Sequence, residues 1–243
     1  MPAARAASGS GRPAQRKMAA PVLERMRELP VDWQARLRQR LLAQPDHRLE
    51  HCRYGGLPSG LPPRLREQLR ADLPAQLQAA AVLVPIVQRP QAPTLLLTVR
   101  ATGLRRHAGQ ISFPGGQLEA HDTDAAAGAV RETGEELGIA PGFITPIGFL
   151  ADHVVRTGYR VTPVVALLQP GFTLELQSAE VAETFELPLS FALAATNYRA
   201  RRRSLREIEL EIWELPYGER LIWGATAGIL AHLRELLGEE EAA

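Results

Sequence analysis

The sequence predicts an α/β protein with a mixed sheet, helices on both faces of the sheet, and a helical N-terminal extension. Segments typical of strands alternate with segments typical of helices along the chain. Two of the strand-like segments are joined by so short a turn that they should pair antiparallel. The composition, with 45% hydrophobic and 23% charged residues, is that of a globular chain and excludes a wholly disordered one.

The chain divides into a tail, an extension and a main domain. Residues 1–20 are rich in Ala, Gly, Ser, Pro and Arg, and we expect them to be disordered, with Met18 as an alternative start. Residues 21–77 are expected to form a helical extension whose function cannot be read from the sequence. The main domain is expected to span residues 78–240.

Helices and strands are predicted from the spacing of apolar residues. In the extension, helices are expected at residues 22–29, 32–42 and 63–73. In the main domain, strands are expected at residues 78–88, 94–100, 144–155, 160–168 and 206–214. A short helix is expected at residues 189–195 and a final helix at 225–237. Polar and apolar residues alternate in the last strand, so its glutamates are expected to face water and to take no part in catalysis.

A cluster of acids follows a double-glycine loop in the middle of the chain. Glu132, Glu135 and Glu136 stand at positions i, i+3 and i+4, which a helix projects from one face. Arg131 precedes Glu135 by four residues, but one guanidinium cannot neutralise three carboxylates. A hard divalent cation such as Mg²⁺, which binds carboxylates together with substrate phosphates, can supply the remaining charge. A charge run of this kind is more often a solvated helix face.

The context of the cluster favours the metal site. Phe113-Pro114-Gly115-Gly116 is a loop signature, and Asp122 and Asp124 suit the start of the helix that carries the acids. This unit resembles the Nudix box, in which a glycine, an acid and the run Arg-Glu-x-x-Glu-Glu-x-Gly-aliphatic follow at set distances. The matching residues are Gly116, Asp122, Arg131, Glu132, Glu135, Glu136, Gly138 and Ile139. Thr133 stands where an aliphatic residue is usual in the family.

A second motif resembles one Nudix subgroup, the coenzyme A diphosphatases. That subgroup carries LLTxR(S/A)x3Rx3Gx3FPGG ahead of the box, and has Asp at the Asp122 position with a spacer of eight residues before Arg131. Every specified position of the motif is filled, by Leu96, Leu97, Thr98, Arg100, Ala101, Arg105, Gly109, Phe113, Pro114, Gly115 and Gly116. The resemblance covers roughly residues 78–237. It implies an α/β/α sandwich of the Nudix type.

The resemblance implies hydrolysis of the diphosphate bond of coenzyme A to 3′,5′-ADP and 4′-phosphopantetheine, with Mg²⁺ or Mn²⁺ as cofactor. Glu132 and Glu136 are the expected primary metal ligands, with Glu135 as a third ligand or a water-mediated contact. Arg131 is expected to orient these glutamates. Gly115 and Gly116 would let the backbone and the metal approach the diphosphate closely.

The sequence leaves the general base and the phosphate contacts open. Glu135, Glu180 and Glu183 are the candidates for the base. Arg100 and Arg105 are the expected contacts for the 3′-phosphate, with His107 as a third. The arginines at positions 199, 201, 202, 203 and 206 can also meet phosphate, although such a run is most often solvated. Tyr159 either packs on the sheet or stacks on an adenine.

Charge and composition limit the alternatives. A net charge of +1 and the lack of zinc-finger or helix-turn-helix spacing argue against nucleic acid as a partner, and no run of 18 apolar residues suggests a membrane span. The single cysteine, Cys52, suits a reducing compartment, so a cytoplasmic location is expected. The oligomeric state stays open, with a homodimer as one option. The alternatives in function are a diphosphatase for ADP-ribose or NADH, and a non-catalytic Nudix module that binds a nucleotide.

Overall fold

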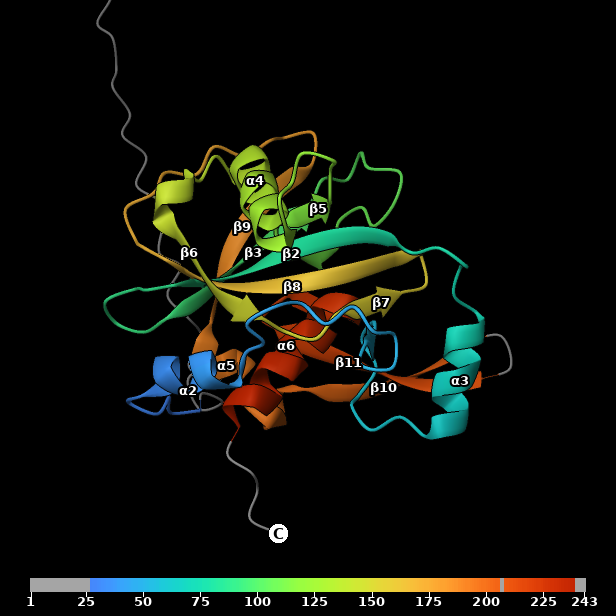
Figure 1. Ribbon diagram of the computed structural model, residues 1–243. Coiled ribbons are helices and arrows are strands. Elements are labelled where there is room, and N and C mark those ends of the chain that lie inside the picture. The colour runs from blue at the N-terminus through green and yellow to red at the C-terminus, as the bar shows by residue number, and fades with distance from the viewer. Residues whose placement is uncertain (1–26, 206–207, 239–243) are drawn as a thin grey trace, which may run out of the picture.

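The computed structural model describes residues 27–205 and 208–238. Within them the chain forms an α/β fold in which a large mixed sheet lies between helices (Figure 1). Helix α4 (Ala125–Leu137) covers one face of this sheet, and helix α6 (Gly224–Leu237) lies on the opposite side. This arrangement confirms the predicted fold class.

The remaining elements include those predicted and several short strands that the sequence does not predict. The other helices are α2 (Trp33–Arg40), α3 (Pro63–Ala71) and α5 (Leu189–Ala192), with 3-10 turns at Pro141–Phe143 and Ala195–Asn197. The main sheet contains β1 (Arg53–Tyr54), β2 (Gln78–Val87), β3 (Thr94–Arg100), β4 (Ile111–Ser112), β5 (Gly115–Gln117), β6 (Ile144–Phe149), β7 (His153–Val155), β8 (Tyr159–Leu168) and β9 (Val181–Pro188). A second sheet contains β10 (Arg199–Leu205), β11 (Ile208–Tyr217) and β12 (Arg220–Trp223). Among the described residues, no helix combines the length and apolarity needed to cross a bilayer.

The pairing of the strands brings distant segments together at one end of β3. β2 runs parallel to β8 and antiparallel to β3 and β5, and the antiparallel β2–β3 pair confirms what the short turn predicts. β3 also pairs antiparallel with β4 and β9. As a result Arg100, the last residue of β3, lies opposite Val181, the first residue of β9. The double-glycine loop, the end of β3 and the start of β9 therefore meet at this edge.

The core has one layer on each face of the main sheet. Neighbouring residues of β2 point to opposite faces, so that Leu83 packs with α4 residues such as Leu137, whereas Val84 packs with α6 residues such as Leu230. All four side chains are fully buried. Burial of one such side chain stabilises the fold by about 1.5–3 kcal/mol. The layer that contains Leu83 and Leu137 holds α4, and with it the acidic cluster, against the sheet.

The described part of the extension packs closely on the main domain. β1 continues the sheet by pairing parallel with β7. Asp152, which is fully buried, accepts hydrogen bonds from Thr162 Oγ1 at 2.7 Å and from His47 Nδ1 of the extension at 2.7 Å. A Cβ placed on Gly228 of α6 would lie only 3.0 Å from the α-carbon of Gly56. The extension and α6 therefore touch backbone to backbone, which only glycine allows.

Two predicted elements differ from the structure. The strand expected at residues 144–155 is broken into β6 and β7, because the chain leaves the sheet at residues 150–152 and turns Asp152 into the interior. Residues 27–30 are irregular where the end of a helix was expected. The rest of that helix, at 22–26, and the tail at 1–20 lie outside the described residues.

The second sheet also corrects one prediction. β10 was not expected as a strand, and its arginines are exposed along its length. Glu209 and Glu211 of β11 face solvent as predicted, but Glu214 is buried, so the prediction is wrong there. Arg201 and Arg203 lie 3.6 Å and 3.7 Å from its carboxylate. The strand alternation ends before Glu214, and the neighbouring arginines compensate its charge.

Two buried histidines lie between β7 and α6. His153 and His232 are 1% and 6% exposed, and their ring centroids are 6.0 Å apart. His153 Nδ1 lies 3.1 Å from the carbonyl oxygen of Gly55. Burial lowers the pKa of each histidine to about 3; the proximity of the other ring contributes for His153, and the charge of Arg53 contributes for His232. Both rings are therefore neutral in the folded protein near pH 7.

These histidines should make stability depend on pH. The unfolded chain takes up protons below a pKa of about 6.5 and the folded chain does not, so their contribution is complete above pH 6.5 and declines as pH falls toward 3. We expect His232→Leu to reduce the slope of unfolding free energy against pH by about 1.4 kcal/mol per pH unit between about pH 5.5 and 4. Urea unfolding at several pH values measures this slope. Equal slopes in the two proteins would contradict the prediction.

Candidate active site

Helix α4 begins and ends where its sequence dictates. Asp124 is its N-cap, and the Asp124 side chain accepts a hydrogen bond from the Ala127 amide at 2.8 Å. Gly138 ends the helix with φ 70°, in the left-handed region that favours glycine. Between these caps the helix carries Glu132, Glu135 and Glu136 in its last two turns. The acids are thus presented from one rigid element.

The double-glycine loop lies directly against two of these glutamates. The Gly115 amide donates a hydrogen bond to Glu136 Oε2 at 3.1 Å. A Cβ placed on Gly116 would lie 2.5 Å from Glu132 Oε1, so the Glu132 carboxylate rests on the Gly116 backbone. β5, which contains both glycines, is held in place by its pairing with β2. The structure therefore brings together four of the residues predicted for the site.

Arg131 connects the helix to the loop that precedes it. Its Nε and Nη2 donate to the two oxygens of Asp122 at 2.9 Å and 3.0 Å, a bidentate pair. Its Nη1 donates to Glu132 at 3.1 Å and to Glu135 at 3.0 Å. The hydrogen bonds from Arg131 and from the Glu119 amide lower the pKa of Asp122 to about 2. Asp122 thus holds Arg131, and Arg131 in turn orients two of the glutamates.

The two glutamates that face the loop have raised pKa values, because the effect of burial exceeds that of the positive charges near them. Glu136 is 4% exposed, and burial raises its pKa to about 7 even though the Gly115 hydrogen bond and the charge of Arg100 oppose this shift. Burial also raises the pKa of Glu132, against the charge of Arg131. Carboxylates in such surroundings are stabilised by an additional cation. This charge deficit is the main indication that the site could hold a metal.

The donor set fits a hard divalent cation held by few protein ligands. Glu132 and Glu136 supply carboxylate oxygens beside the glycine loop, whereas Glu135 is 60% exposed in its side chain and contacts Arg131. Among the described residues, no three acidic, histidine or cysteine side chains are already gathered as a metal cluster. Mg²⁺ commonly uses one or two carboxylates and completes its octahedral shell with waters and substrate phosphates. Glu132 and Glu136 could hold such an ion.

Two residues outside helix α4, Arg100 and Glu180, also act on the glutamates. The charge of Arg100, at the end of β3, acts on Glu136, and the Arg100 Nε is buried without a hydrogen-bond partner. The charge of Glu180 acts on both Glu132 and Glu136. The backbone places Glu180 beside β3, because its carbonyl accepts the Ala101 amide at 2.8 Å. Arg100, at the end of β3, and Glu180, in the turn before β9, therefore act electrostatically on the same buried carboxylate of Glu136.

The structure separates the three candidates for the general base. Glu180 acts electrostatically on the loop-facing glutamates, as described above. Glu183 instead pairs with Arg220 at 2.9 Å, on the partly exposed surface of β9. Glu135 is engaged by Arg131. Sequence spacing alone ranks these three equally, since Glu180 reaches the site only through the pairing of β9 with β3.

Several other predicted phosphate contacts lie apart from the carboxylates. Arg105 and His107 are exposed in the loop between β3 and β4, and the described contacts join neither of them to the glutamates. His107 has a φ of 58° and lies 2.8 Å through Nδ1 from Gln110 Oε1. The arginines at positions 199, 201, 202 and 203 belong to β10 of the second sheet, and Arg206 lies outside the described residues. Tyr159 is half-buried at the start of β8.

Comparison with known proteins places the whole arrangement in one family. The family model for the NUDIX domain matches residues 77–208. The chain is 43% identical over 159 residues to an uncharacterized Nudix hydrolase, NudL, of Escherichia coli K12, which covers 65% of this chain and 82% of NudL. It is 42% identical over 161 residues to NudL of Cronobacter sakazakii, and this match covers 66% of this chain and 83% of that NudL.

A solved Nudix hydrolase from M. smegmatis, RenU, has 24% identity and a TM-score of 0.41, over 47% of this chain and 72% of RenU. Divalent metal ions are typical cofactors of Nudix hydrolases, and nucleotides are typical substrates. With more than half of its length matched by the family model, and with most of NudL covered at this identity, the chain belongs to the Nudix hydrolase family, which acts on phosphoanhydride bonds.

Proposed function

We propose that this Nudix hydrolase cleaves the diphosphate bond of coenzyme A or its acyl thioesters, releasing 3′,5′-ADP and 4′-phosphopantetheine or its acyl form. One observation carries the proposal. The subgroup motif meets the Nudix box at a single place: Gly115 and Gly116 rest on Glu136 and Glu132, and the charge of Arg100 acts on Glu136. Residues typical of the coenzyme A subgroup thus line the same carboxylates as the residues typical of the family.

The roles of the residues follow from the geometry. Glu132 and Glu136 would hold Mg²⁺ or Mn²⁺, which when bound neutralises diphosphate oxygens and lowers the pKa of a coordinated water. Arg131, fixed by Asp122, keeps Glu132 oriented. The glycine loop lets the diphosphate approach the backbone closely, since no side chain intervenes.

Arg100 and Glu180 would act on the substrate directly. The guanidinium of Arg100, whose charge acts on Glu136, is suited to a phosphate oxygen. Glu180 is the acid best placed to accept the proton of the attacking water, because it acts on both loop-facing glutamates and has no side-chain ion pair among the described residues. Water then attacks one phosphorus, the bridging P–O bond breaks, and the leaving phosphate takes the electron pair.

A substrate panel tests the proposal. We expect release of 3′,5′-ADP from coenzyme A and its thioesters with Mg²⁺ or Mn²⁺, no release with EDTA, and slower cleavage of ADP-ribose and NADH. Faster cleavage of ADP-ribose or NADH would assign the enzyme to that substrate class. Metal binding without cleavage of any diphosphate would favour a non-catalytic module that binds a nucleotide. The presence of all three glutamates of the Nudix box argues against such a module.

The 3′-phosphate contact is tested by comparing coenzyme A with dephospho-coenzyme A, which lacks that group. We expect Arg105→Ala to lower kcat/KM for coenzyme A by about tenfold and to change that for dephospho-coenzyme A little, since one charge-assisted hydrogen bond is lost. Arg106→Ala is the matched control, because Arg106 is the exposed neighbour outside the motif. Equal losses on both substrates would remove Arg105 from this role.

A further inference from the structure

A pocket in the N-terminal extension lies apart from the candidate active site. It has a volume of about 380 Å³ and is open to solvent between the segment around β1, the loop that follows it and helix α3. All of its lining residues fall between positions 50 and 66, ahead of the region matched by the family model. No residue of the candidate active site lines it. Its size is that of a site for a small organic molecule.

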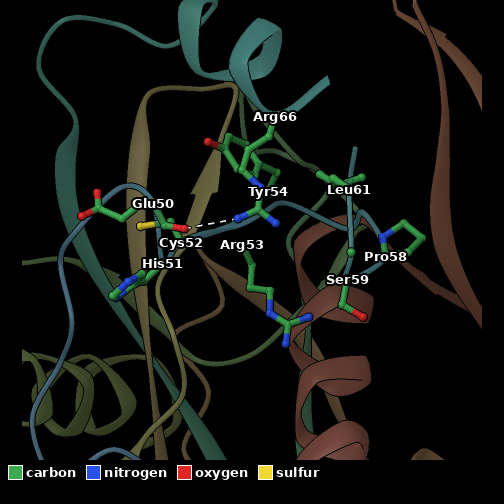
Figure 2. Close-up of a pocket in the computed structure, with 10 residues that line it drawn as sticks. Glu50, His51, Cys52, Arg53, Tyr54, Pro58, Ser59, Leu61 and Arg66 are labelled. Carbon is green, nitrogen blue, oxygen red and sulfur yellow. Dashed lines mark hydrogen bonds between the residues drawn. The ribbon is translucent and has the colours of Figure 1, made fainter. Parts of the chain in front are cut away.

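Two guanidinium groups face this pocket. Arg66 reaches from α3 toward the β1 segment, where its Nη1 donates to the Glu50 carbonyl oxygen at 3.3 Å (Figure 2). Arg53 is anchored at one end, since its Nη2 donates to Glu235 at 2.8 Å. A guanidinium carries five N–H donors, and the hydrogen bonds of the described residues use one from each of these two arginines. Most of their donors therefore remain available to a ligand.

The rest of the pocket adds an imidazole and an apolar wall. His51 contacts the Asp46 carboxylate through Nδ1 at 2.6 Å. Since a carboxylate only accepts, Nδ1 is the donor and the Nε2 of the neutral ring is an acceptor. Pro58 and Leu61 lie on the other side of the opening from His51 in Figure 2. Ser59 is fixed by its hydrogen bond to Glu235 at 2.9 Å. The lining thus combines cationic donors with a hydrophobic surface.

The charged groups and the thiol of the pocket limit the kinds of ligand that it can bind. Glu50 is the one acid among the lining residues, and its side chain is exposed, so it can turn toward water. Cys52 is buried, and its pKa is raised to about 11 by burial, so it remains a neutral thiol that donates to the Arg48 carbonyl oxygen. Glu235 offsets the charge of Arg53, with which it pairs, whereas Arg66 pairs with no acid among the described residues and so keeps an unmatched positive charge in the pocket.

We propose that this pocket binds a small organic phosphate, with the phosphate group held between Arg53 and Arg66 and the apolar part of the molecule against Pro58 and Leu61. Guanidinium groups match the oxygens of a phosphate through paired N–H donors. The volume exceeds that of a phosphate group alone, which is why the ligand needs an organic body. The proposal concerns the extension and does not depend on the substrate of the catalytic domain.

Binding of AMP, ribose 5-phosphate and inorganic phosphate to the full chain in EDTA tests the proposal by calorimetry and by NMR of the backbone amides. We expect saturable binding of AMP or ribose 5-phosphate that is tighter than that of inorganic phosphate, with shifts at the amides of residues 59–61. Arg66→Ala should weaken binding by about tenfold or more, since hydrogen bonds to a charged group are lost. Arg64→Ala, an exposed arginine of the same helix outside the pocket, should change it less than about twofold.

The controls separate this pocket from the catalytic site and from misfolding. Glu136→Gln should leave the binding and the shifts at 59–61 unchanged. Arg66→Lys keeps the charge and the aliphatic stem, so it should fold normally and bind with intermediate affinity. Equal losses for Arg64→Ala and Arg66→Ala, shifts confined to the glycine loop, or an absence of saturable binding by the wild type would overturn the proposal.

Discussion

Replacing Glu136 with glutamine is expected to lower kcat by about 100- to 1,000-fold, the effect of removing a group that stabilises transition-state charge. Glutamine keeps the shape of the side chain and can still accept the Gly115 amide hydrogen bond. It cannot supply the negative charge that would hold a divalent cation. Steady-state kinetics at saturating Mn²⁺ measure the loss.

The same substitution should not destabilise the metal-free protein. Burial raises the pKa of Glu136 to about 7, so the ionised carboxylate is disfavoured in the fold and a neutral amide removes that penalty. We therefore expect the melting temperature in EDTA to stay equal or rise, and the increase caused by Mn²⁺ in the wild type to shrink. Glu135→Gln is the matched control, with an expected loss below about tenfold because its carboxylate is exposed and, among the described residues, contacts only Arg131. Full turnover in Glu136→Gln would show that Glu136 is not a metal ligand.

Alanine substitutions at the two loop glycines should differ in their main effect. Gly116→Ala should mainly lower activity, and Gly115→Ala should mainly lower stability. At Gly116 a Cβ would meet the end of the Glu132 side chain at 2.5 Å, and that side chain can move away. We expect Gly116→Ala to fold with a loss of stability under about 1 kcal/mol, but to lose about 100-fold in kcat/KM, since displacing a catalytic group by about 1 Å costs this much.

At Gly115 the obstacle is backbone. A Cβ there would collide with the Ala81 carbonyl oxygen and lie 2.6 Å from the Val82 α-carbon, and the φ of 146° suits only glycine. We expect Gly115→Ala to destabilise the protein by about 3 kcal/mol or more, because β2 and β5 must separate. Gly142→Ala is the control, since nothing lies within 4 Å of its added Cβ.

Chemical denaturation together with kinetics distinguishes the two glycines. The expected pattern is a folded but slow Gly116→Ala, an unstable Gly115→Ala and an unchanged Gly142→Ala. If Gly116→Ala kept full activity, the contact between this glycine and Glu132 would have no part in catalysis. A stable Gly115→Ala would mean that the close approach of β5 to β2 can relax.

Much of the fold could be predicted because its signals are local. The β2–β3 pair follows from two apolar runs and a short turn, and α4 follows from an Asp N-cap and a terminal glycine. The break between β6 and β7 could not be predicted, since it depends on Asp152 finding partners in Thr162 and His47. The burial of Glu214 likewise depends on arginines supplied by the neighbouring strand.

The residues of the candidate site likewise divide into those that local sequence predicts and those that only strand pairing brings to the site. Glu132, Glu136, Gly115 and Gly116 are identified by their spacing in one continuous segment, because a helix and a loop convert spacing into position directly. Nothing in the spacing ranks Glu180 above the other acids proposed as the base, since the pairing of β9 with β3 brings it to the carboxylates.

The sequence by itself determined the family, the α/β class and the acidic helix behind a double-glycine loop, since each depends on residues close together in the chain. Only the tertiary structure decided which acids face the loop, that Arg100 and Glu180 join them, and that the extension carries a basic pocket. These features depend on contacts between segments far apart in sequence, and such contacts are set by packing and strand pairing rather than by local residue preference.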